Sequence, residues 1–78
     1  MDKLNEFKKL LKIFEENIDN IAQKISQKEK REKAIVMNEL LNSREYFMEK
    51  LEFFENNETV IEEAINGVIE EIANLLEK

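Results

Sequence analysis

The chain has 78 residues and contains no cysteine, histidine or proline and only one glycine. This length predicts a single domain spanning residues 1–78. The missing cysteine and histidine exclude disulfides, thiolate metal sites and the usual general base. Helix breakers are almost absent, so the composition favours an all-α fold. No apolar run is long enough to span a bilayer, and the first residues lack the apolar stretch of a secretory signal. We therefore expect a cytoplasmic protein.

The net charge of −6 is unevenly distributed along the chain. Residues 1–38 carry nine basic and seven acidic residues, whereas residues 39–78 carry three basic and eleven acidic residues. The second half therefore has a net charge of −8. Such a surface repels nucleic acid and attracts basic partners at long range.

The first predicted helix has the most regular apolar pattern in the chain. Its apolar residues recur at spacings of three and four, which places them on one helical stripe of three heptads. This pattern predicts a helix over about residues 3–25. The stripe consists of Leu4, Phe7, Leu11, Phe14, Ile18, Ile21 and Ile25.

The polar segment that follows permits two interpretations. Ser26 and Glu29 have the spacing of a capping box, which would start a new helix. Alternatively, residues 26–33 form a solvated part of one continuous helix. We favour a break near residues 26–28, because a chain this short needs hairpins to build a core.

The second predicted helix covers about residues 28–55 and has a wide apolar arc. Leu41 and Met48 lie beside its main stripe, and Tyr46 and Phe53 flank the other side. An arc of this width is enough to contact two neighbouring helices. The main stripe runs through Met37, Leu40, Arg44, Phe47, Leu51 and Phe54.

The third predicted helix covers about residues 59–77. Asn56 and Asn57 give a loop signal before it, and Thr59 with Glu62 has the spacing of a second capping box. Its stripe consists of Ile61, Ile65, Val68, Ile72 and Leu75. Three amphipathic helices with short connections predict an antiparallel three-helix bundle. The alternative is a long helical hairpin that dimerises.

Catalytic chemistry is not predicted. No histidine or cysteine is present to activate the few hydroxyl groups, and one glycine cannot form a glycine-rich phosphate loop. Neighbouring glutamates such as Glu62 and Glu63 point about 100° apart on a helix, so they do not easily share a metal. We therefore expect no enzymatic activity, no metal, no cofactor and no small-molecule substrate.

The residues expected to bind a partner lie on the second predicted helix. Arg44 interrupts its apolar stripe, and three interpretations are open: it pairs with a glutamate across an interface, it contacts a partner, or its head group reaches water. Exposed aromatic and acidic neighbours complete the candidate set. That set is Arg44, Glu45, Tyr46, Glu49, Glu52 and Phe53.

A basic cluster between Lys24 and Lys33 is the only feature that resembles a nucleic-acid footprint. It contains Lys24, Lys28, Lys30, Arg31 and Lys33. Glu29 and Glu32 partly neutralise it, and no aromatic residue is available for base stacking. A solvated connection with local ion pairs is the simpler interpretation, so we do not expect nucleic-acid binding.

Two functions are compatible with these features. The first is a small non-catalytic protein–protein interaction module, such as an adaptor, a small subunit or an oligomerisation unit. Its partner is another protein or a second copy of the chain in a homodimer. The alternative is a phage- or plasmid-encoded acidic inhibitor, anti-CRISPR-like or antitoxin-like. Its carboxylates would occupy the phosphate sites of a basic nucleic-acid-handling effector.

Overall fold

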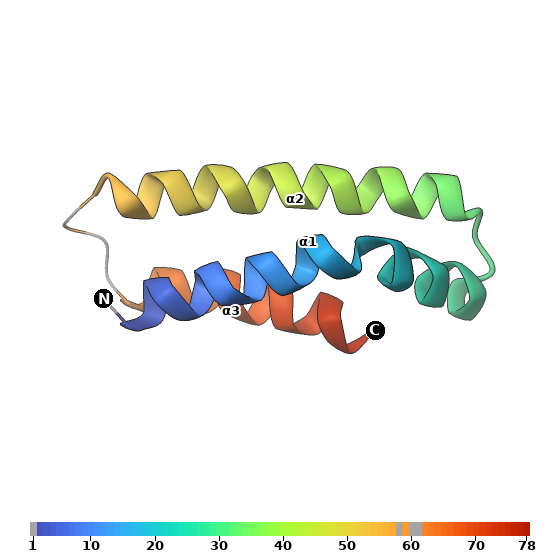
Figure 1. The fold of residues 1–78 in the computed structure, drawn as a ribbon, viewed down its shortest axis with the longest axis horizontal. Coiled ribbons are helices and arrows are strands. Elements are labelled where there is room, and N and C mark those ends of the chain that lie inside the picture. Colours follow the sequence, from blue (N-terminus) through green and yellow to red (C-terminus); the bar gives the residue numbers. More distant parts are fainter. Residues whose placement is uncertain (1, 58, 60–61) are drawn as a thin grey trace.

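A computed structural model describes residues 2–57, 59 and 62–78, and these form three helices. They are α1 (Asp2–Glu29), α2 (Lys33–Glu55) and α3 (Glu62–Glu77). Consecutive helices run antiparallel (Figure 1). The predicted all-α three-helix bundle is therefore confirmed. α1 packs against both other helices, whereas the described residues of α2 and α3 show no comparable packing against each other.

The apolar stripe of α1 forms the centre of the core. Phe7 and Phe14 are completely buried, and Leu4 is partly buried at the start of the stripe. No polar side chain is buried among the described residues, so the core is stabilised by apolar packing alone. The remaining buried residues of α1 are Leu11, Ile18, Ile21, Ala22 and Ile25.

Aromatic rings interlock α1 with α2. The ring centroid of Phe7 lies 6.4 Å from that of Phe47 and 6.0 Å from that of Phe54. Phe14 contacts Phe47 at 5.8 Å with nearly perpendicular rings. Such edge-to-face pairs contribute about 0.5–1.5 kcal/mol each beyond the burial of their area. They also fix the antiparallel register, because each ring of α1 lies beside a particular ring of α2.

α3 covers only part of the hairpin that α1 and α2 form. Ile65, Val68 and Ile72 are buried, and Leu75 and Leu76 are partly buried at its C-terminal end. α3 is shorter than the other two helices, so the far end of the hairpin extends beyond it (Figure 1).

The break between the first two helices exists, but its predicted position is wrong. α1 continues through Ser26 and ends at Glu29, and the hydroxyl of Ser26 donates to the carbonyl of Gln23 at 2.9 Å. Ser26 therefore satisfies a backbone group inside α1 and does not cap a new helix. The structure likewise excludes the alternative of one continuous helix across residues 26–33.

The end of α1 is set by a left-handed residue. Lys30 has a φ of 56°, and the amide of Arg31 donates to the carbonyl of Ser26 at 3.0 Å. This hydrogen bond is the long one of a Schellman motif, in which the left-handed position is usually glycine. Because this position holds a lysine and not a glycine, the end of the helix could not be recognised from the sequence.

The predicted ends of the second and third helices, at residues 55 and 77, are confirmed, whereas their predicted starts differ from the structure. α2 begins at Lys33 instead of residue 28, after an N-cap at Glu32 whose side chain makes no capping hydrogen bond. α3 is described from Glu62 onward, and Thr59, the predicted first residue of this helix, lies in a turn. Residues 58, 60 and 61, which include the predicted core residue Ile61, lie outside the described part of the chain.

We predict that Lys30→Gly stabilises the fold. Glycine adopts φ near 56° without the clash of a Cβ, so the free energy of unfolding should rise by about 1 kcal/mol. Lys24→Gly, inside α1, is the matched control and should lower it by about 1 kcal/mol. Urea unfolding followed by circular dichroism measures both variants. A loss of stability in Lys30→Gly would contradict the assignment of the left-handed helix end.

We also predict that Gly67→Ala stabilises α3. A Cβ atom placed on Gly67 would have no neighbour within 4 Å, and the backbone φ of Gly67 is not positive. Alanine therefore adds helix propensity without a clash, worth about 1 kcal/mol. The melting temperature should rise, and Ala73→Gly should lower it. An unchanged or lower value for Gly67→Ala would mean that something packs against this position in solution.

Candidate functional site

Three large apolar side chains are exposed on the same face of α2. Ile35 is 50% exposed, Tyr46 is 40% exposed and Phe53 is 53% exposed. They are separated by eleven and seven residues, which returns each side chain to within about 20° of the previous one. We refer to these three residues as the exposed face of α2.

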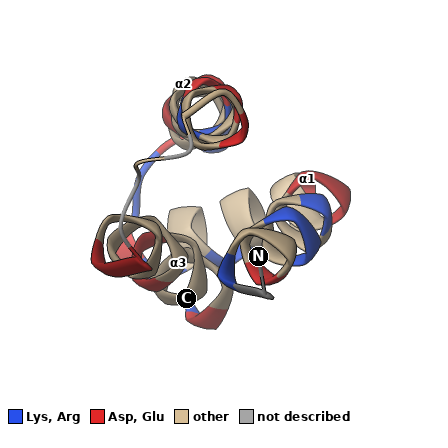
Figure 2. Ribbon diagram, turned by 90° about the vertical axis from the view of Figure 1, so that its left-hand side faces the viewer, with Lys and Arg blue, Asp and Glu red and all other residues tan. Residues whose placement is uncertain are grey.

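A groove of about 490 Å³ lies between α2 and α3, next to the exposed face. Phe47, which is buried, and Leu75, which is partly buried, provide its apolar surface. Seen along the bundle axis, α2, α1 and α3 occupy three corners (Figure 2). The residues that line the groove are Asn42, Ser43, Tyr46, Phe47, Glu71, Asn74, Leu75 and Lys78.

Tyr46 belongs to both the groove and the exposed face. Its ring centroid lies 5.5 Å from that of Phe47 in an edge-on arrangement, so the Tyr46 ring packs against the buried Phe47 ring. The ammonium group of Lys50 lies 5.6 Å from the Tyr46 ring centroid, within cation–π distance. Tyr46 is thus held in place and still offers an apolar ring with a polar hydroxyl to a partner.

The opposite edge of α2 is joined to α1 by charged pairs. Such half-exposed pairs contribute little stability, but they show that the charged side chains of this edge already have partners. None of the ion pairs found among the described residues joins α2 to α3. The three α1–α2 pairs are Lys8–Glu55 at 3.1 Å, Asp19–Lys33 at 2.9 Å and Glu15–Arg44 at 3.7 Å.

Arg44 does not share a face with the aromatic residues predicted beside it. Its side chain reaches Glu15 of α1, and its position lies about 160° from Tyr46 around the helix. The pairing of Arg44 with a glutamate therefore occurs within the chain. Arg44 is the predicted site residue that the structure separates most clearly from the exposed face.

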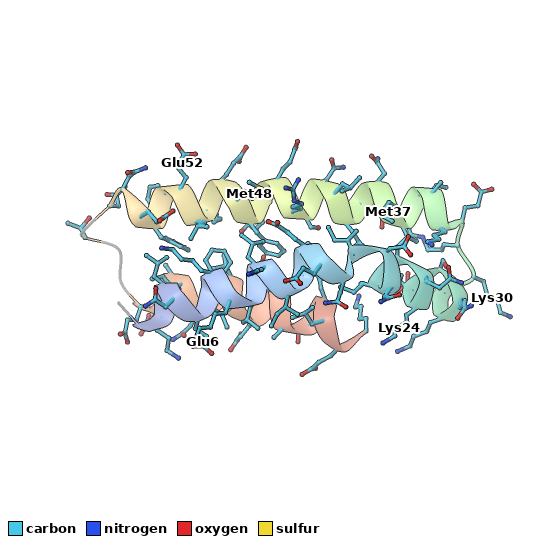
Figure 3. All side chains as sticks on the ribbon, in the orientation of Figure 1. Glu6, Lys24, Lys30, Met37, Met48 and Glu52 are labelled. Atoms are coloured by element: carbon cyan, nitrogen blue, oxygen red, sulfur yellow. The ribbon has the colours of Figure 1, made fainter. Side chains whose placement is uncertain are left out.

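The three predicted glutamates lie on the solvent side of α2. Glu45, Glu49 and Glu52 are all exposed, and Figure 3 shows Glu52 projecting away from α1. Glu49 is nearest to the exposed face, about 60° from Tyr46. The structure thus brings Tyr46 and Phe53 together, with Glu49 beside them.

Ile35 and the residues of the groove on the α3 side were not predicted from the sequence. The spacing of eleven residues between Ile35 and Tyr46 was a usable signal, because eleven residues complete three helical turns. Glu71, Asn74 and Lys78 gave no signal, because their position depends on how α3 packs on α1.

A second, smaller groove of about 330 Å³ lies where α3 ends against α1. Ile13, which is 46% exposed, lines it together with Leu76. Ile13 therefore does not join Tyr46 and Phe53 in one apolar surface.

The basic cluster lies at the turn between α1 and α2. Lys24 and Lys30 both lie toward this end of the hairpin (Figure 3). Arg31 pairs with Glu39 of α2 and also with Glu29 at 3.3 Å. The hydrogen bond from Arg31 lowers the pKa of Glu39 below its ordinary value, and the pKa of Arg31 is raised, chiefly by the same hydrogen bond. Arg31 is therefore engaged within the chain.

We predict that the pKa of Glu39 depends on Arg31. Because the pKa of Glu39 is lowered in the folded chain, the pair stabilises the fold above the pKa of an unfolded glutamate. This stabilisation is lost as the pH falls through the lowered pKa. In Arg31→Gln, an NMR titration should return the Glu39 pKa toward its ordinary value. A Glu39 pKa that Arg31→Gln leaves unchanged would show that the pair does not form in solution.

Neither a metal site nor a membrane span is found in the described part of the chain. No three acidic side chains there are grouped as metal ligands. None of the three helices combines the length and apolarity needed to cross a bilayer. Comparison with known protein families, with characterised proteins and with solved structures finds no match.

Proposed function

We propose that this chain is a non-catalytic protein-binding module whose binding surface is the exposed face of α2 and the adjoining groove. The observation that supports this proposal is the position of Tyr46 and Phe53. Both rings are at least 40% exposed, whereas the remaining four phenylalanines of the chain are all buried. Aromatic side chains held beside an apolar groove are typical anchors of protein interfaces.

The polar groups of the groove suit binding better than catalysis. Its lining contains amide, hydroxyl, carboxylate and ammonium groups from Asn42, Ser43, Glu71 and Lys78. The chain has no histidine or cysteine to activate the Ser43 hydroxyl, and that hydroxyl donates to the backbone of Glu39 at 3.1 Å. We therefore propose that these groups position a partner. The lack of cysteine accords with a cytoplasmic location, where small domains do not rely on disulfides.

The charge of α3 favours a second candidate, an acidic inhibitor of a basic nucleic-acid-handling protein. All five charged residues of α3 are glutamates. Figure 2 shows acidic segments on this helix and on the outer side of α2. A surface of this kind competes with phosphate groups for a basic groove. Both candidates bind a protein and differ in whether apolar anchors or carboxylates dominate the contact.

A photo-crosslinker placed at Phe53 tests the proposed function. We predict that p-benzoylphenylalanine at position 53 yields one discrete cross-linked species in an extract of the source cells, detected by mass spectrometry. Excess unmodified protein should compete it away, because a specific surface is saturable. A species at twice the chain mass would identify a second copy as the partner.

The same crosslinker at Lys12 is the matched control, because Lys12 is exposed on α1 and lies away from the groove. Equal labelling from both positions, or labelling that excess protein does not reduce, would contradict the proposal.

A further inference from the structure

We infer that the groove between α2 and α3 binds a single amphipathic helix of a partner protein, with lysine or arginine flanking its apolar stripe. This inference rests on the proposed function and adds the class of partner to it. Three features support it: the position of the groove in the bundle, the apolar residues along one side of it, and the charge of the helices that form it.

The groove occupies the place of a fourth helix. α1 packs against both α2 and α3, but the described residues of α2 and α3 pack only weakly against each other. Four-helix bundles fill such a position with one more helix that contacts both neighbours. The groove is lined by residues 42–47 of α2 and residues 71–78 of the C-terminal part of the chain, and Phe53 lies about 10 Å beyond Tyr46 along α2. A partner helix of about 16 residues, or about 24 Å, is long enough to fill the groove and to reach Phe53.

The apolar groups suit a helical stripe. Phe47 and Leu75 form the groove surface, and Tyr46 stands at its edge. Phe53 continues the same face of α2 two turns further along. A partner helix with apolar residues at spacings of three and four contacts such a row along its whole length.

The charge of the two helices selects a basic partner. α1 carries six basic and six acidic residues and is neutral, whereas α2 carries three basic and five acidic residues. α3 has a net charge of −5. In the lining itself Glu71 and Lys78 offset each other, and Lys50 adds a positive charge beside Tyr46. The negative potential therefore comes from the other charged residues of α2 and from the glutamates of α3. This potential attracts lysine and arginine on the flanks of a bound helix.

A second copy of the chain is a poorer occupant. It carries the same net charge of −6, and a symmetric contact places the same surface of both copies together. Such a contact would bring the acidic faces of two α3 helices near each other. Self-association is therefore an outcome that the experiment must be able to detect.

A synthetic peptide tests the inference directly. The probe is a peptide of about 16 residues, with leucines on one helical face, lysines on both flanks and neither tyrosine nor tryptophan. Tyr46 is the only tyrosine of the chain, which has no tryptophan, so its fluorescence reports on the groove. We expect a saturable change in this fluorescence. Raising the salt from about 50 to about 300 mM should weaken binding several-fold.

Two peptides control for the probe. One has glutamates in place of the lysines, and the other has the same composition with its leucines scattered around the helix. Neither should saturate the Tyr46 signal. Equal binding by the scattered peptide would mean attraction by charge alone and would overturn the inference.

Paired variants test the location. Phe53→Lys should weaken peptide binding at least about tenfold, and Glu71→Lys several-fold, because they remove an apolar anchor and reverse the local charge. Leu41→Lys, also an exposed apolar position of α2, and Glu16→Lys, an exposed charge reversal on α1, should leave it within about twofold. Circular dichroism confirms that each variant is folded.

Three outcomes overturn the inference. The first is no binding of the lysine peptide by the folded chain. The second is binding that Leu41→Lys weakens as strongly as Phe53→Lys. The third is a dimer, seen by light scattering, that Phe53→Lys converts to a monomer. The third outcome would leave the proposed protein-binding function intact, with a second copy as the partner. A missing cross-link at position 53 would instead count against the proposed function itself.

Discussion

The structure depends on the apolar stripe of α1. α1 has a single apolar stripe and packs against both α2 and α3, so both contacts depend on that stripe. Phe7 and Phe14 are completely buried and contact phenylalanine rings of α2, and they belong to the same core cluster as the buried residues of α3. The core contains no buried polar side chain within the described residues, so its stability comes from packing and aromatic contacts, without hydrogen bonds between side chains.

This arrangement gives α2 two different edges. On the edge toward α1, Lys33 and Arg44 pair with acidic residues of α1. On the edge toward α3, Tyr46 and Phe53 remain exposed. A bundle in which α2 and α3 packed closely against each other would cover this second edge. The open groove and the exposed aromatic rings thus have one cause, the central position of α1.

Much of the fold followed from local sequence patterns. The stripes of α1 and α3 repeat every three or four residues, and such periodicity depends only on helical geometry. The end of the first helix was predicted less well, because Lys30 adopts a conformation that is usually adopted by glycine. Arg44 is noticeable in the sequence because it interrupts the apolar stripe of α2, yet its partner Glu15 could not be identified without the packing of α1 on α2.

Only part of the candidate site could be predicted from the sequence. Tyr46 and Phe53 were recognised because they fall outside the main stripe of α2. The groove beside them was not, since Glu71 and Asn74 reach it only through the packing of α3 on α1. The groove is formed by α2 and α3, which both pack on α1. The sequence pattern of a single helix therefore does not predict it.

Solvent access to the Tyr46 ring in the free protein reports whether the groove between α2 and α3 is open. Photochemically induced nuclear polarisation requires a dye molecule to reach the ring, and Tyr46 is the only tyrosine of the chain. We expect strong polarisation of Tyr46 that does not change with protein concentration, because the groove is open in a single copy. A Tyr46 ring without polarisation in the dilute protein would contradict this expectation, since α3 or a second copy would then cover the proposed binding surface.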